Sequence, residues 1–301
     1  MSNDRKVWLN GSLVPWEEVT VPLLSHGFSR GSAIFEVFGI HKGADGVYTF
    51  RMDEHLKRLE TTARLLEMEL AYTSEEIAAA VKETVAANGV ERGLIKLMAY
   101  WSEEAITELV LDSKLDVAIY AIPESDTLKL HQMDTPITAC FSKWRKLHPE
   151  TVPIPAKACA NYLNSYLNRK DANNRGFNIG IMKGTDGLLA EGSTESVFIV
   201  KDGVLKTPPL GRVLSSISRK SILEAAPLLG IPVGEVCIDA EELYTADEIL
   251  TCHTSVKVHA ISQFEDYHLQ APGPVTQKLI AFMKQIIEVN DDRFQHWFQK
   301  I

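Results

Sequence analysis

The most informative stretch of the sequence is PAKACANYL, at residues 155–163. Lys157 lies there among small, uncharged residues, which is unusual for a lysine on a solvated surface. A pocket that removes water from the amine lowers its pKa and makes it a better nucleophile toward an aldehyde, and small neighbours leave room for a flat ring. Viewed alone, Lys157 is better explained as an ordinary lysine at the end of a strand. The surrounding sequence must therefore show whether Lys157 is a nucleophile.

Two residues that follow Lys157 carry compatible chemistry. Tyr162 opens a helix expected over residues 161–175, where its phenol can donate a hydrogen bond, although packing is the commoner role of such a tyrosine. Glu191 follows an Asp186-Gly187 turn. A carboxylate that faces a pyridine nitrogen keeps that nitrogen protonated and able to withdraw electrons. The alternative is a loop glutamate in water, as we expect for Glu195.

Three further places can bind an anion. Arg51 ends a strand where a helix begins, and a guanidinium can hold a phosphate through two hydrogen bonds, although a surface salt bridge is the simpler role. The stretch LSSISR at residues 214–219 opens a helix, so its hydroxyl and amide groups either bind an anion or simply cap the helix. The turn TCHTSV at residues 251–256 offers similar groups. His253 has no partners with metal-ligand spacing, so no metal site is expected.

Hydrophobic spacing predicts a mixture of strands and helices. An Asn10-Gly11 turn predicts a hairpin over residues 7–14. An apolar stripe with alternating spacings of three and four predicts a helix capped by Asp53, and Thr73 with Glu76 forms the capping box of a second helix at 74–88. The stripe consists of Leu56, Leu59, Ala63, Leu66 and Leu70. Further strands are expected at 34–40, 48–51, 94–101, 115–122, 137–141, 177–182, 195–200, 204–206 and around 249–261, and further helices at 218–229 and 274–289.

Length and composition limit the class of protein. The 301 residues suggest a small N-terminal α/β domain at 1–122, a linker at 123–136 and a larger C-terminal domain at 137–301 that carries Lys157. A net charge of −9 argues against non-specific nucleic-acid binding. No apolar run suits a membrane helix or a signal peptide. The four cysteines lie among small or apolar residues, so we expect reduced, buried thiols and a cytoplasmic location.

Taken together, the motifs resemble the fold-type IV pyridoxal-phosphate enzymes, and the resemblance runs from about residue 7 to residue 274. The order and spacing of the motifs make the match specific, and residues 149–163 are closest to branched-chain aminotransferases. The motifs are FE at 35–36, FR at 50–51, HLKRL at 55–59, Lys157 with NYL at 161–163, EG at 191–192, SVF at 196–198, TPP at 207–209, ISR at 217–219, ADE at 246–248 and Thr254. The implied fold is α+β with two domains, similar to D-amino-acid aminotransferase, in which a small α/β domain accompanies a larger, β-barrel-like domain with flanking helices.

The resemblance also implies a role for each residue. Lys157 would form a Schiff base with pyridoxal 5'-phosphate and move the proton between the substrate α-carbon and the cofactor. Glu191 would pair with the pyridine nitrogen, and Tyr162 would reach the phenolic oxygen. The phosphate would be held by Arg51, the amides of Ile217 and Ser218, and Thr254. The amides of Ser255 and Val256 would face the substrate carboxylate. Family members are typically homodimers or larger, in which the small domain of one chain closes the pocket of its partner.

This sequence departs from the branched-chain pattern in the expected substrate pocket, which also includes Phe35. Arg30 stands where those enzymes usually have an aromatic residue, and Lys96 stands where an arginine helps to bind the side-chain carboxylate of glutamate. Lys96 can still hold a carboxylate as a point charge. Val37 and Gly39 replace a glycine and an arginine, and Val37 is closer to the D-amino-acid and (R)-amine members. His253 replaces a glycine beside Thr254.

The leading hypothesis is an aminotransferase that moves an amino group between a branched-chain L-amino acid and a 2-oxo acid such as 2-oxoglutarate. The alternatives are a D-amino-acid or (R)-amine transaminase and an aminodeoxychorismate lyase, against which the lack of a threonine near Val37 counts weakly. A non-catalytic binding protein on the same fold is disfavoured because Lys157, Glu191 and Arg51 occur together.

Overall fold

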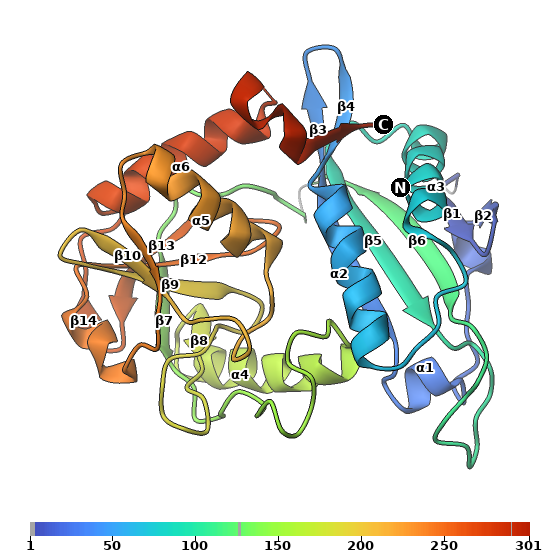
Figure 1. Ribbon diagram of the computed structural model, residues 1–301, viewed down its shortest axis with the longest axis horizontal. Helices are drawn as coiled ribbons and strands as arrows, with labels where there is room; N and C mark the ends of the chain where they lie inside the picture. The colour runs from blue at the N-terminus through green and yellow to red at the C-terminus, as the bar shows by residue number, and fades with distance from the viewer. Residues whose placement is uncertain (1–3, 126–127, 290) are drawn as a thin grey trace. The chain divides into compact units, whose positions relative to one another are not determined.

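The computed structural model of the chain describes residues 4–125, 128–289 and 291–301. Packing groups the described residues into two compact units (Figure 1). Unit 1 comprises Met1–Lys129, Ala156–Ala160 and Ile286–Ile301, and unit 2 comprises Leu130–Pro155 and Asn161–Gln285. The domain boundaries expected from the sequence stay a prediction, and the linker expected at 123–136 includes residues 126 and 127, which lie outside the described residues.

Unit 1 is built on one antiparallel sheet in the order β15-β4-β3-β5-β6-β1-β2. Its strands are β1 (Lys6–Leu9), β2 (Ser12–Pro15), β3 (Ile34–Gly43), β4 (Gly46–Phe50), β5 (Gly93–Tyr100), β6 (Asp116–Pro123) and β15 (Phe298–Lys300). Its helices are α1 (His26–Ser29), α2 (Met52–Leu65) and α3 (Ser74–Asn88), with short 3-10 turns at Trp16–Glu18 and Asp292–Trp297. Gly93 is required where β5 meets β6, because a Cβ atom there would lie 2.1 Å from the carbonyl oxygen of Ile122.

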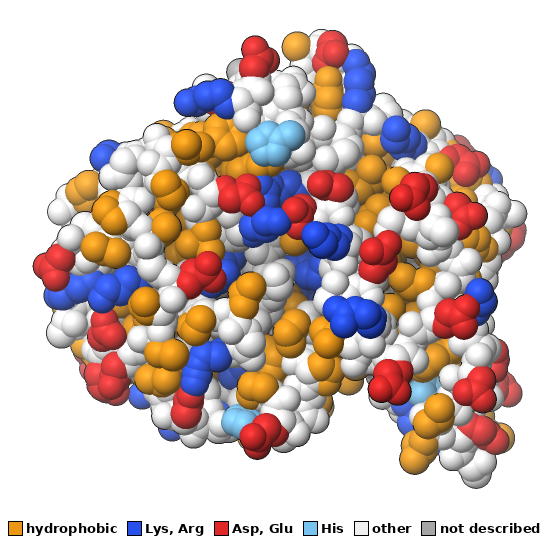
Figure 2. Space-filling model, in the orientation of Figure 1, with side chains coloured by type: hydrophobic (Ala, Val, Ile, Leu, Met, Phe, Trp, Pro, Cys, Tyr) orange, Lys and Arg blue, Asp and Glu red, His pale blue; other side chains and the backbone are white. Residues whose placement is uncertain are grey.

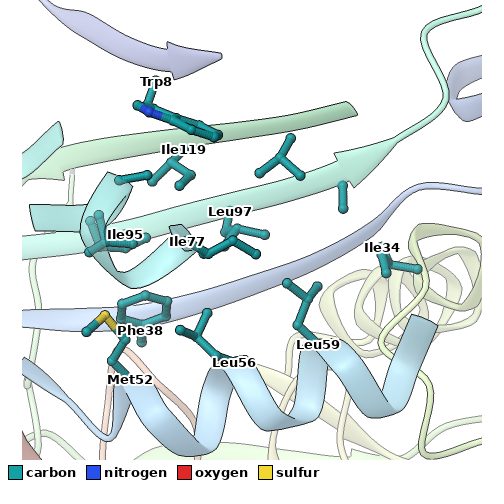
Figure 3. Packing of buried hydrophobic residues seen from close by; sticks show 14 of the residues in the cluster. Trp8, Ile34, Phe38, Met52, Leu56, Leu59, Ile77, Ile95, Leu97 and Ile119 are labelled. Carbon is teal, nitrogen blue, oxygen red and sulfur yellow. The ribbon is translucent and has the colours of Figure 1, made fainter. Parts of the chain in front are cut away.

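The core of unit 1 lies between this sheet and the helices α2 and α3 (Figure 3). Leu56 and Leu59 of α2 pack toward Phe38 of β3 and the neighbouring strand β5. Ile77 joins the same cluster from α3 and is 1% exposed. Each of these large side chains contributes about 1.5–3 kcal/mol through burial, so the apolar stripe read from the sequence fixes α2 on the sheet.

Unit 2 contains a mixed sheet in the order β11-β10-β9-β12-β13-β7-β8, with β14 paired to β13. Its strands are β7 (Ile137–Phe141), β8 (Ile179–Ile181), β9 (Ser196–Lys201), β10 (Val204–Thr207), β11 (Val233–Glu235), β12 (Glu248–Cys252), β13 (His259–Phe264) and β14 (Tyr267–His268). Its helices are α4 (Tyr162–Asn174), α5 (Ile217–Leu228) and α6 (Pro274–Ile287), with a 3-10 turn at Ala240–Thr245, and another at Cys159–Asn161 precedes α4. Strands and helices of both units confirm the α+β class.

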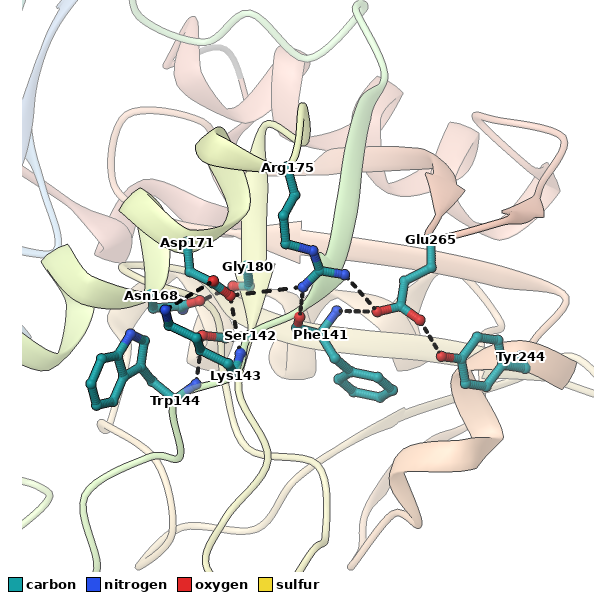
Figure 4. Close-up of polar contacts among 10 residues, drawn as sticks. All are labelled: Phe141, Ser142, Lys143, Trp144, Asn168, Asp171, Arg175, Gly180, Tyr244 and Glu265. Atoms are coloured by element: carbon teal, nitrogen blue, oxygen red, sulfur yellow. Dashed lines mark hydrogen bonds and ion pairs between the residues drawn. The ribbon is translucent and has the colours of Figure 1, made fainter.

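A polar network in unit 2 joins β7, the end of α4 and the turn between β13 and β14 (Figure 4). One carboxylate oxygen of Glu265 accepts hydrogen bonds from the backbone N–H of Phe141 and from Arg175, each at 3.2 Å. The hydroxyl of Tyr244 donates to the other oxygen. Burial and this hydrogen bond raise the pKa of Tyr244 above its usual range. Glu265 therefore connects three segments that are distant in sequence.

The local sequence signals mark several elements at the right places. The Asn10-Gly11 turn joins β1 to β2, with both residues at positive φ. Thr73 and Glu76 form the expected capping box of α3. The prediction that Asp53 caps α2 is wrong. Arg51, whose backbone is in the left-handed region at φ 51°, occupies the N-cap, and Asp53 lies in the first turn.

Candidate functional site

Lys157 lies on a short strap, residues 156–160, that packs with unit 1 although its flanking segments belong to unit 2. The strap pairs antiparallel with the chain at residues 31–35. The backbone N–H of Phe35 donates to the carbonyl of Lys157 at 3.2 Å, and the N–H of Cys159 donates to the carbonyl of Ala33 at 2.7 Å. The backbone of the candidate nucleophile is therefore fixed by the beginning of β3.

The side chain of Phe35 lies beside two amines. The Nζ of Lys157 lies 4.6 Å from the centroid of its ring, and the Nζ of Lys96 lies 3.6 Å from it. Burial lowers the pKa of Lys96 below its usual value. These three expected site residues come together in unit 1, and the aromatic face favours both ammonium groups.

Next to Phe35 in β3, Glu36 has a completely buried carboxylate, which binds two residues of α2. Arg58 donates to it through Nε at 2.7 Å and Nη2 at 2.6 Å, and the Nδ1 of His55 lies 2.7 Å from it. Burial on its own would raise the pKa of Glu36, but Arg58, and then His55, lower it to about 2. The motifs FE and HLKRL are thus parts of one ionic cluster, a link that 18 intervening residues hide in the sequence.

Arg51 is buried and precedes α2 at its N-terminus. Its guanidinium lies 4.1 Å from the ring centroid of Trp297, and its backbone N–H donates to the carbonyl of Trp297 at 2.6 Å. The indole face holds the cation by a cation–π contact. Trp297 was missed in the sequence, because a single tryptophan near the C-terminus offers no signal of this role.

In unit 2, both oxygens of the Glu191 carboxylate are held. The Nζ of Lys146 lies 2.5 Å from Oε1, and the backbone N–H of Leu214 donates to Oε2 at 3.1 Å. Both charged side chains are 10% exposed, so Glu191 is a buried anion with its charge balanced, rather than a glutamate in water. Glu195 is also buried and pairs with Arg169, which contradicts the expectation that it is solvated. Lys146 was missed because it lies in a stretch of the sequence without a clear pattern.

The start of α5 provides two backbone donors. Ser216 caps the helix by accepting from the N–H of Arg219 at 3.3 Å. The N–H groups of Ile217 and Ser218 have no acceptor among the residues that the structure describes. Free amides and the helix dipole favour an anion at this place, so capping and anion binding are compatible.

The turn after β12 holds the remaining anion-binding candidates. The N–H of His253 donates to the carbonyl of Val256 at 3.0 Å and closes the turn that contains Thr254 and Ser255. The carbonyl of Ser255 accepts from the N–H of His131 at 2.7 Å. Burial lowers the pKa of His253. Tyr162 begins α4 as expected.

The structure adds two findings on residues discussed in the sequence. Arg30 is exposed and donates through Nη2 to the carbonyl of Ile106 at 3.1 Å, so it holds a surface loop of unit 1. Cys140 and Cys252 are buried, but the prediction of four buried thiols is wrong, because Cys237 is exposed and Cys159 is half-buried.

The donors of each unit fit pyridoxal phosphate: unit 1 offers an amine on a fixed backbone, and unit 2 offers a buried carboxylate and amides at a helix start. In the described ranges 4–125, 128–289 and 291–301, no group of three or more His, Cys, Asp or Glu side chains could hold a metal. Within the same part of the chain, no helix has the length and apolar character needed to span a membrane.

Comparisons with known proteins agree with this chemistry. The profile of the family described as "Amino-transferase class IV" matches residues 33–264. A branched-chain-amino-acid aminotransferase of Salmonella typhimurium is 31% identical over 91% of this chain and 90% of its own. The crystal structure of a branched-chain aminotransferase from Thermoproteus uzoniensis with norvaline has a TM-score of 0.93 and 36% identity, covering 98% of this chain and 99% of that one.

A second solved structure has a similar fold. It is the branched-chain amino acid aminotransferase from Thermobaculum terrenum in its PLP-form, with a TM-score of 0.92 and 30% identity over 99% of both chains. These likenesses confirm the resemblance inferred from the motifs and the fold that it implies. The chain therefore belongs to the class IV aminotransferases.

Proposed function

We propose that this protein is a pyridoxal-phosphate-dependent aminotransferase that moves an amino group between a branched-chain L-amino acid and a 2-oxo acid. The observation that carries the proposal is Lys157 in a class IV aminotransferase, with its backbone fixed by β3 and its amine beside Phe35. The cofactor, when bound, supplies an aldehyde that condenses with amines and a ring that withdraws electrons from the α-carbon.

The residues of the chain would share the remaining work. Lys157 would hold the cofactor through its amine, and the same amine would accept the α-proton of the substrate and return it. Glu191 would present a carboxylate to the ring nitrogen, while the ammonium of Lys146, 2.5 Å from Oε1, would balance its charge and orient it. Tyr162 would donate to the phenolic oxygen of the cofactor.

The two anionic ends would be held by cations and amides. Arg51, the amides of Ile217 and Ser218, and Thr254 would bind the phosphate. The amides of Ser255 and Val256 would bind the substrate carboxylate. Each of these groups binds an anion without changing its own charge.

The substrate proposal is supported by the relatives, which are named for branched-chain amino acids. Lys96 supports a 2-oxo acid with a second carboxylate, such as 2-oxoglutarate. Its ammonium lies at the same ring of Phe35 as the amine of Lys157, and it can pair with a carboxylate as a point charge. Arg30 and Phe35 stay in the proposed substrate pocket, and the guanidinium of Arg30 donates to the carbonyl of Ile106 in the loop between β5 and β6.

We also propose that the protein forms a homodimer or a larger homo-oligomer. Unit 1 has an apolar patch whose members are each more than half exposed, and Figure 2 shows hydrophobic beside acidic side chains on the loop between β5 and β6. The patch consists of Leu23, Leu24, Phe28, Ile106, Leu109 and Val110. The carbonyl of Leu24 accepts from the N–H of Ala105 at 3.0 Å, so its two segments are joined. Contiguous exposed apolar surface of this kind is typical of protein interfaces.

The cysteines, all free thiols, support a cytoplasmic location.

The test is the near-visible absorption spectrum of the purified protein with pyridoxal phosphate, before and after adding L-leucine or D-alanine. We expect a yellow band that L-leucine converts and D-alanine does not. Conversion by D-alanine alone would establish the opposite handedness, and a band that responds to neither would point to a lyase or another amine. Lys157→Ala should remove the band and the turnover while leaving the fold intact. Wild-type turnover in that variant would refute the assignment.

A further inference from the structure

The backbone of Lys157 is held on two sides. Its carbonyl accepts from the N–H of Phe35 on β3, and its own N–H donates to the Oγ1 of Thr62 on α2 at 3.1 Å. Thr62 has no exposed surface. The strap at residues 156–160 is therefore attached to the helix as well as to the strand.

The position of Thr62 follows from the polar face of α2. His55, Arg58 and Thr62 succeed one another at spacings of three and four residues, which places them on one side of the helix. His55 and Arg58 bind the buried carboxylate of Glu36, which follows Phe35 in β3. The ionic cluster thus fixes the helix that carries Thr62 against the strand that carries Phe35.

We propose that Thr62 is a positioning residue for the reaction: it fixes the backbone of Lys157 so that the amine is presented at one place beside Phe35. The proposal rests on the function proposed above, in which Lys157 is the reacting amine. Without the Thr62 acceptor, the strap keeps its bonds to residues 31–35 but loses this hydrogen bond to α2. The amine is then spread over several positions, and small displacements of a reacting group are costly in rate.

The test compares Thr62→Val, which removes the acceptor at nearly constant shape, with Thr62→Ser, which keeps it. Thr62→Ala is made in parallel, because an added methyl group can disturb folding at a fully buried position. Thr84→Val is the matched control. Thr84 is a buried threonine of α3 in the same unit, and its hydroxyl donates to the carbonyl of Ala80 at 2.6 Å, away from the strap.

Two quantities are measured: the hydrogen-exchange rate of the Lys157 amide without cofactor, and kcat and KM for the amino acid. In Thr62→Val we expect exchange to rise about fivefold, as for the loss of one hydrogen bond. We expect kcat to fall about tenfold or more, with KM changed by about twofold or less. Thr62→Ser should remain close to the wild type in both quantities.

Three results would overturn the inference. They are unchanged exchange and kcat in both Thr62→Val and Thr62→Ala, an equal loss in Thr62→Ser, or the same changes in Thr84→Val. A wild-type protein that binds no cofactor would instead refute the proposed function, and this inference with it. A wild type with a normal band and turnover, matched in every measurement by Thr62→Val, would refute this inference alone.

Discussion

Replacing Glu36 by glutamine should strongly destabilise unit 1. The change removes the charge of a carboxylate with 0% exposure while its partner Arg58 stays buried, at 8% exposure. Breaking a buried ion pair by removing one partner typically costs about 3–5 kcal/mol, because the remaining charge is uncompensated. The pKa of Glu36 gives a similar figure: at about 1.4 kcal/mol per pKa unit, a drop from 4.5 to about 2 corresponds to about 3 kcal/mol at neutral pH.

The same pKa sets the pH dependence. Because the pKa of Glu36 is lowered in the folded state, its contribution is fully present above its unfolded value, 4.5, and is lost as the pH falls toward about 2. The stability difference between wild type and Glu36→Gln should therefore shrink by about 2 kcal/mol between about pH 5 and about pH 2.5.

Urea unfolding followed by tryptophan fluorescence measures both effects. Four of the five tryptophans, Trp8, Trp16, Trp101 and Trp297, lie in unit 1, so the signal reports mainly on that unit. The control is Glu91→Gln, which removes an exposed pair with Lys42 and should cost less than about 1 kcal/mol. If Glu36→Gln were as mild as the control, or kept the full wild-type pH dependence, Glu36 could not be the ionised partner of Arg58.

Three further changes test other parts of the molecule. Lys146→Met leaves the buried Glu191 carboxylate unbalanced and should cost about 3 kcal/mol in urea unfolding, with partial recovery in Lys146→Arg; full stability in the methionine variant would contradict the pairing. Arg51→Ala should weaken pyridoxal phosphate binding about tenfold to a hundredfold, measured by titrating the absorption band, since it removes a charge-assisted phosphate contact; unchanged affinity would exclude Arg51 from the phosphate site. Glu265→Gln weakens the bonds from Arg175 and Tyr244 and should lower the free energy of unfolding by about 1–2 kcal/mol, which a thermal melt shows as a lower midpoint. An unchanged midpoint would show that the network contributes little.

The features that could be predicted from the sequence are those that a few neighbouring residues determine, such as helix starts and tight turns. The capping box at Thr73 and Glu76 specifies where α3 begins, and the Asn10-Gly11 turn specifies the first hairpin, since both signals act within a few residues. Strand β15 was missed because three residues at Phe298–Lys300 are too short for a period to be read, and its pairing with β4 spans most of the chain.

The candidate site divides in the same way. Lys157, Glu191 and the start of α5 could be proposed from the sequence because each stands beside a local signal: small neighbours, a turn or a helix start. The partners were missed because they come from distant segments. Lys146 and Glu191 are 45 positions apart in the sequence, and Thr62 and Lys157 are 95 positions apart, so only the folded chain brings each pair together.

The ribosome makes the parts of unit 1 at very different times. Strands β1 to β6 emerge early, whereas β15, which pairs with β4, and Trp297, whose carbonyl accepts from Arg51, emerge after all of unit 2. Until then β4 has an unpaired edge, and such edges attract other strands. Domains generally fold during synthesis in their N-to-C order. Here the unit that contains the first strand of the chain is the one that is completed last, so chaperone protection should matter most while unit 2 is being made.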